Sequence, residues 1–227
     1  MVATIYPSLT KDQRPYNVVN SFREADESIV GYIFAHARLP CPANDSSGIE
    51  NCTLSQGIFP YRTLGMAQMP ANAAGLDMHY SVFRRPNNDL RLDADLAVTA
   101  DRYHPFWAQD LPPIAQPRAL GQRNALDFCH GLSVGGGSTF NTNFLHVGAD
   151  TSAEHVAYLL LDAGLKDASG DGDPLDGVNV TGNLHFERPE VQADRNNDDR
   201  VYVRYFAELQ AELGCSNVLL PTGLAAL

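Results

Sequence analysis

The chain lacks a long apolar run and an excess of basic charge. No stretch of its 227 residues approaches the roughly 20 consecutive apolar residues that span a bilayer. It carries 16 Lys and Arg residues against 27 Asp and Glu residues, for a net charge of -11. Such a chain should be repelled by nucleic acid and by anionic lipid surfaces, so we expect neither as a partner. Residues 1–15 have no charged segment followed by an apolar one, and so do not predict a signal peptide.

Cysteine is scarce, and its spacing does not fit a zinc site. An even number without a CxxC motif favours two disulfides in an oxidising compartment, with four reduced, buried thiols in a cytosolic protein as the alternative. Cys41 and Cys52 enclose a short polar loop and are the simpler pair, which leaves Cys129 to pair with Cys215. An oxidising compartment without an export signal leads us to expect that another segment precedes Met1 in the natural protein.

The seven histidines are scattered, and none pair at the spacing of a zinc site. The segment GLSVG (131–135) matches the G-x-S-x-G nucleophile elbow, with Asp162 and His185 following in the order of a hydrolase triad. The elbow requires a buried strand before Ser133 and a helix after it, and the flanking sequence predicts neither. A serine hydrolase at Ser133 is therefore a remote alternative.

The most ordered pattern is an amphipathic helix over residues 16–37. Its apolar residues recur at steps of three and four, which places them on one face: Val18, Phe22, Ala25, Ile29 and Ile33. Pro40 disfavours helical geometry at Leu39, so we expect the helix to end near Ala37.

The rest of the chain predicts short strands and helices between loops. We expect strands over 76–84, 155–164, 184–186 and 200–205, and helices over 120–132 and 206–214. This order predicts one α+β domain over 1–227 with antiparallel pairing. Residues 1–15 form a leader, 84–120 are a candidate insertion, and 216–227 form a loose tail.

Acidic residues gather late in the chain, in a glycine-rich loop and at the start of the last strand. Oxygen ligands on a glycine-turned loop are what calcium requires, although the order is not that of an EF-hand. A solvated turn without metal remains the alternative. The candidate calcium ligands are Asp167, Asp171, Asp173, Asp176, Asp198 and Asp199.

Several segments together resemble a family of bacterial type IV pilin-like proteins. ARLPCPAN…NC…GIFPYRTLGM (37–66) is similar to the family's GRLPCPA…LPW-x-TLG signature. Four further segments resemble family segments in the expected order: AGLDMHYSV, LDFCHGL, HVAYLLLDAGLKD and NDDRVYVRY. The chain departs from the pattern at Ala37, where the family has glycine, and at Tyr61 and Ala74, where it has tryptophan.

The resemblance implies a non-enzymatic structural subunit, a minor pilin or pseudopilin of a type IV pilus or type II secretion-like filament. Its fold would be a long N-terminal amphipathic helix packed on an antiparallel sheet, loop-rich and stapled by disulfides. An apolar helix before Met1 would anchor the subunit in the inner membrane, with the head periplasmic or at the cell surface and other such subunits as partners. The resemblance implies no required cofactor. Because pseudopilin members of the family have calcium in a late acidic loop, it also favours calcium binding in the acidic loop of this chain.

An adhesive or substrate-binding tip pilin is the alternative function. The proline-rich segment 103–118 would then offer Tyr103, Phe106 and Trp107 as a recognition surface. The simpler interpretation is that Trp107 fixes this segment to the core.

Overall fold

The computed structural model describes residues 14–70, 76–99, 123–165, 167, 170, 172–191 and 197–215. The fold is mixed α and β, with antiparallel sheet pairing and two disulfides. Residues 1–13 of the leader, the greater part of the candidate insertion and the loose tail lie outside the described residues, and the last two leader residues belong to the first helix.

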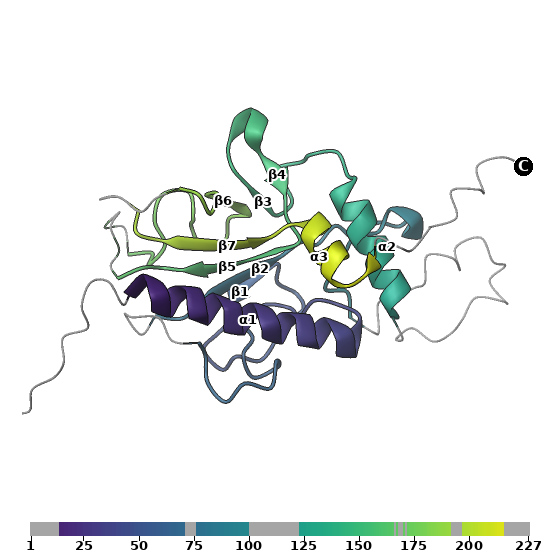
Figure 1. Ribbon diagram of the computed structural model, residues 1–227. Coiled ribbons are helices and arrows are strands. Elements are labelled where there is room, and N and C mark those ends of the chain that lie inside the picture. The colour runs from purple at the N-terminus through teal and green to yellow at the C-terminus, as the bar shows by residue number, and fades with distance from the viewer. Residues whose placement is uncertain are drawn as a thin grey trace, which may run out of the picture.

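The first helix, α1 (Arg14–His36), begins and ends within two residues of the predicted bounds. Its apolar stripe is buried in the core, and it runs along the larger sheet (Figure 1). Phe22 stacks on Tyr202 of β7 (Arg200–Arg204), with ring centroids 5.8 Å apart. The chain leaves α1 through Ala37, whose φ of 49° is the only positive value at a described non-glycine residue. That left-handed position ends the helix before Pro40 and is one that glycine adopts more readily.

The larger sheet has four antiparallel strands in the order β1-β2-β5-β7. The inner strands are β2 (His79–Val82) and β5 (Tyr158–Asp162), and β1 (Gln56–Ile58) forms the edge opposite β7. Every residue of β5 is buried, which explains the continuous apolar run that predicted it. Its register places Leu160 between Tyr80 of β2 and Tyr202 of β7.

A second sheet has three two-residue strands, in the order β4-β3-β6. These are β3 (His146–Val147), β4 (Glu154–His155) and β6 (His185–Phe186). The β3–β4 pair is antiparallel, but β3 and β6 are parallel, so the prediction of antiparallel pairing is wrong for that pair. A long connection between β3 and β6 allows the chain to re-enter in the same direction. Short 3-10 turns occur at Leu90–Leu92 and Asp150–Ser152.

Two further helices, α2 (Ala125–Gly136) and α3 (Phe206–Glu212), lie side by side beyond the end of the larger sheet (Figure 1). Asn124 caps α2 by accepting hydrogen bonds from two backbone amides, and Asp127 completes a capping box. The helices approach closely at Gly135, where an added Cβ would lie 2.4 Å from the Phe206 ring.

Candidate functional site

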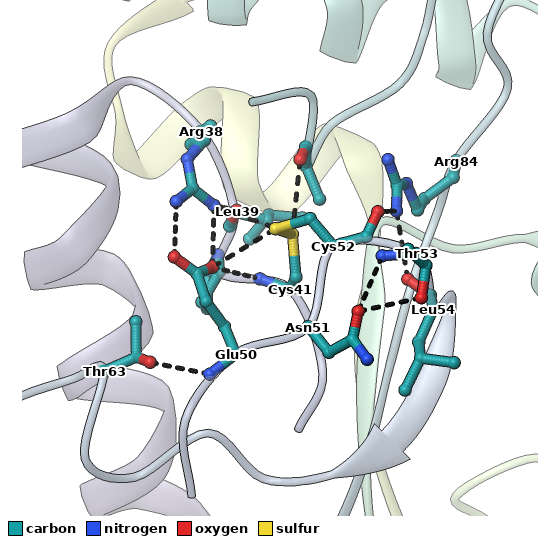
Figure 2. Close-up of a disulfide and its surroundings, with 12 residues drawn as sticks. Arg38, Leu39, Cys41, Glu50, Asn51, Cys52, Thr53, Leu54, Thr63 and Arg84 are labelled. Carbon is teal, nitrogen blue, oxygen red and sulfur yellow. Dashed lines mark hydrogen bonds and ion pairs between the residues drawn. A yellow bond between two sulfur atoms is a disulfide. The ribbon is translucent and has the colours of Figure 1, made fainter. Parts of the chain in front are cut away.

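The loop closed by Cys41 and Cys52 is fixed to the end of α1 by one carboxylate (Figure 2). Arg38 donates to both oxygens of Glu50, at 2.9 and 2.6 Å, and the Cys41 amide donates to the same carboxylate at 2.9 Å. Tyr32 of α1 donates to it from 3.3 Å. A bidentate guanidinium–carboxylate pair gives a fixed orientation as well as attraction.

The electrostatics of this pair favour the ionised carboxylate. Burial alone would raise the pKa of Glu50, but hydrogen bonds from Arg38 and the Cys41 amide outweigh it and hold the pKa below its usual value. Arg38 also lies over the Tyr32 ring, 5.1 Å from its centroid. The sequence did not lead us to predict the pair of Arg38 and Glu50. Arg38 lies three positions before Cys41 and Glu50 two positions before Cys52, and these opposite charges beside the two cysteines could have indicated it.

The other side of this loop is held by Arg84, just beyond β2 (Figure 2). Arg84 donates to the carbonyls of Cys52 and Leu54 at 2.6 and 3.1 Å, and forms a two-point ion pair with Asp95 at 2.9 Å. The side chains of Arg84 and Asp95 are only 9% and 2% exposed, so the pair is part of the core. The predicted Cys41–Cys52 disulfide is confirmed, and it lies in a rigid, hydrogen-bonded setting.

The second disulfide joins α2 to the residues after α3. Cys129 pairs with Cys215, with Cα atoms 5.3 Å apart and 86 positions between them in the sequence. Both predicted pairs are therefore confirmed, and the structure has no free cysteine among the described residues. Disulfides of this kind are typical of oxidising, extracytoplasmic environments.

The structure brings together three of the six aspartates proposed as calcium ligands. Asp176, Asp198 and Asp199 each offer an oxygen within 4.8 Å of the others, at the N-terminal end of β7. Asp167 and Asp173 lie outside this group and accept backbone amides of their own turns, from Gly172 and Leu175 among others. Asp171 lies outside the described residues.

Backbone amides orient the three carboxylates by binding one oxygen of each. Asp199 Oδ2 accepts from the Asp176 amide at 2.8 Å and from Asn179 at 3.1 Å. Asp198 Oδ2 accepts from the Leu165 amide at 3.0 Å, and Asp176 Oδ2 accepts from the Asp198 amide at 3.2 Å. The Oδ1 atoms of Asp198 and Asp199 are buried without a hydrogen-bond partner. Burial, together with the neighbouring carboxylates, raises the pKa of Asp199 to about 7.

This arrangement suits a hard divalent cation. Buried carboxylate oxygens without a partner are costly unless a proton or a cation neutralises them. Calcium takes six to eight oxygen ligands, which carboxylates, carbonyls and water together supply. Gly164 is required here, because with φ at 68° an added Cβ would lie 2.3 Å from Asp198 Oδ1.

The GLSVG segment does not form a nucleophile elbow. It lies within α2, with Ser133 exposed on the helix, where the elbow would need a sharp turn between a strand and a helix. Asp162 is a buried residue of β5, and His185 Nε2 lies 2.8 Å from the Gly148 carbonyl. Gly135 of the motif serves packing, since an added Cβ there would lie 2.4 Å from the Phe206 ring.

The predicted recognition surface of Tyr103, Phe106 and Trp107 lies outside the described residues. Within the part of the chain that the structure describes, no helix is both long and apolar enough to cross a membrane. Comparisons with protein-family models, with curated proteins and with solved structures found no match to this chain.

Proposed function

We propose that this chain is the head of a pilin-like structural subunit, a minor pilin or pseudopilin of a bacterial filament. The observation that carries the proposal is α1, a 23-residue helix with its apolar stripe buried in the core and with contacts from Phe22 and Asp26 to β7 of the larger sheet (Figure 1). A helix held by one face leaves the opposite face free for neighbouring subunits. Cysteine-stapled loops suit a head that works outside the cytoplasm.

The exposed face of α1 is the surface expected to meet other subunits. Phe34 is 70% exposed and Val19 is 64% exposed, at opposite ends of the same helix. Exposed large apolar side chains are common singly, but on a helix that would continue into a filament core they are suited to intersubunit contact.

The test uses the full-length gene product in its native bacterium. The proposal expects a prepilin peptidase site and about 20 apolar residues encoded before Met1. It also expects that Phe34→Asp abolishes recovery of the protein with sheared surface filaments. Leu126→Asp, on an α2 side chain that is 55% exposed, is the matched control and should leave recovery unchanged. A native N-terminus at Met1, found by mass spectrometry, would overturn the proposal.

We also propose that Asp176, Asp198 and Asp199 bind calcium and so fix the acidic loop to β7. The support is the pair of buried, unpartnered Oδ1 atoms described above. Calcium at 100 times its Kd should raise the free energy of unfolding by about 2.7 kcal/mol, measured by thermal unfolding with and without chelator. Asp199→Asn should abolish this response, whereas Asp173→Asn, in the same loop, should retain it. An equal response in both variants would contradict the site.

A further inference from the structure

Three histidines lie in one row across the small sheet. His155 of β4 is directly opposite His146 of β3, and His146 is directly opposite His185 of β6. Residues directly opposite one another on paired strands project from the same face. The His146 and His185 rings are stacked, with centroids 4.8 Å apart and planes within 5°. We call these three residues the histidine row.

Each of the three rings has one nitrogen within hydrogen-bond distance of a backbone carbonyl. His155 Nε2 lies 3.0 Å from the Asn141 carbonyl and also 3.1 Å from the Asn141 amide. His146 Nδ1 lies 2.8 Å from the Phe144 carbonyl, and His185 Nε2 lies 2.8 Å from the Gly148 carbonyl. A carbonyl oxygen only accepts, so each of these nitrogens carries the hydrogen of a neutral imidazole. A second proton on His146 would place a positive charge on a ring stacked against His185, with ring centroids 4.8 Å apart.

Aromatic side chains pack against two of the histidines in the row. The Phe140 ring lies 5.1 Å from the His155 ring and 5.2 Å from the His146 ring. The Phe144 ring lies 6.1 Å from the His155 ring. His146 is 4% exposed. His155 and His185 are half-buried, so a charge on His146 is the one that is poorly solvated.

The described charged neighbours do not neutralise protonated rings. Arg85, beyond β2, lies over Phe144 and adds positive potential at His155. Glu154 alternates with His155 along β4, so it faces the other side of the sheet, where it pairs with Arg188 at 2.8 Å. Glu187 follows β6 and accepts no proton from the row; its backbone amide donates to Asn179.

We propose that the histidine row is an acid-sensitive latch, which holds the β4-β3-β6 sheet closed when the His146 and His155 rings are neutral and releases it when those two rings are protonated. Burial lowers the pKa of His146, and the two neighbouring histidines lower it further; burial and Arg85 lower the pKa of His155. The unfolded segment therefore binds more protons than the folded sheet just below pH 6.5. Stability of the sheet is complete above that pH and is lost as the pH falls toward the lowered values.

The test follows the unmodified protein by NMR between pH 8 and pH 5. The ring signals of His146 and His155 should titrate below pH 6.5. The amides of His146 and Gly148, which hold β3 to β6, should lose exchange protection by about tenfold per pH unit for each linked proton, after correction for intrinsic exchange. The Ala157 amide, bonded to Arg204 in the larger sheet, should keep its protection.

A pair of variants separates the row from other histidines. His185→Gln keeps a donor for the Gly148 carbonyl and should reduce the pH dependence of β3 protection. His79→Gln, in β2 of the larger sheet, should leave it unchanged. Ring titrations at or above pH 6.5, or β3 protection that does not change between pH 8 and pH 5, would overturn the proposal. The pH titration of the unmodified protein is sufficient to test the proposal, so the proposal can be tested even if a variant fails to fold.

Discussion

Replacing Asp26 should detach α1 from the larger sheet more than any exposed change on that helix. Asp26 Oδ1 accepts from Tyr158 of β5 at 2.5 Å and from Arg204 of β7 at 2.9 Å. Asp26 is 8% exposed, and the Arg204 side chain is 17% exposed. Burial and the adjacent Asp26 carboxylate raise the pKa of Tyr158 well above its usual value, so the hydroxyl stays protonated and donates.

The expected loss of stability in Asp26→Ala arises because the substitution leaves the charge of Arg204 without one of its partners. Removing one partner of a buried ion pair costs about 3–5 kcal/mol, because the remaining charge is uncompensated. Arg204 keeps a second partner, Glu212, which places the expected loss near the lower end, at about 3 kcal/mol. Tyr158→Phe leaves the Asp26–Arg204 pair intact and should cost about 1 kcal/mol.

Urea unfolding with both disulfides intact measures these differences, provided that the m value is unchanged. The double variant Asp26→Ala, Tyr158→Phe should cost less than the sum of the single variants by about 1 kcal/mol, because no hydroxyl is left unpaired. Glu27→Ala is the matched control, since its pair with Arg23 is 4.0 Å long and exposed, and it should change stability by less than about 0.5 kcal/mol. A loss below about 1 kcal/mol for Asp26→Ala, or strict additivity, would refute the reasoning.

Three further predictions concern the ends of helices and the longer disulfide. Ala37→Gly should stabilise the protein by about 1 kcal/mol because φ is positive there, while Ala35→Gly within α1 should destabilise it by a similar amount; thermal unfolding distinguishes the two. Asn124→Ala should cost about 1 kcal/mol in calorimetry, through loss of the α2 cap. Replacing Cys129 and Cys215 together by Ala should lower the free energy of urea unfolding by about 2–5 kcal/mol, and by more than the equivalent change at the shorter disulfide loop.

Long periodic segments were predictable from the sequence; of the very short strands, β6 was predicted but β1 and β3 were not. The stripe of α1 repeats over several turns, so the helix was found within two residues of its observed bounds. The apolar run predicted a strand over 155–164, of which Tyr158–Asp162 form β5 and His155 belongs to β4. The strands β1 and β3 have three and two residues, too few to show alternation. Their pairing depends on contacts between distant parts of the chain, which a local pattern does not contain.

The acidic residues also show that a local sequence pattern does not contain contacts between distant residues. Composition identified the loop and the pair at 198–199 but could not say which carboxylates meet. The selection is made by backbone amides, since the turns around Gly172 and Leu175 bind Asp167 and Asp173. Among the candidate calcium ligands that the structure describes, Asp198 and Asp199 at the end of β7 each have a buried oxygen without a hydrogen-bond partner.

The loop carrying the family resemblance is held by more than its disulfide. Its sequence resemblance lies in the residues around Cys41, but its position is set by Glu50 on the side of α1 and by Arg84 on the side of β2. Arg84 joins two carbonyls of this loop to Asp95, whose segment lies more than 40 residues further along the chain. Reduction of the disulfide alone should therefore loosen the loop without releasing it, because each anchor acts on backbone groups that remain bonded when the sulfurs part. In a protein with so little sheet among its described residues, buried ion pairs of this kind determine where the loops lie.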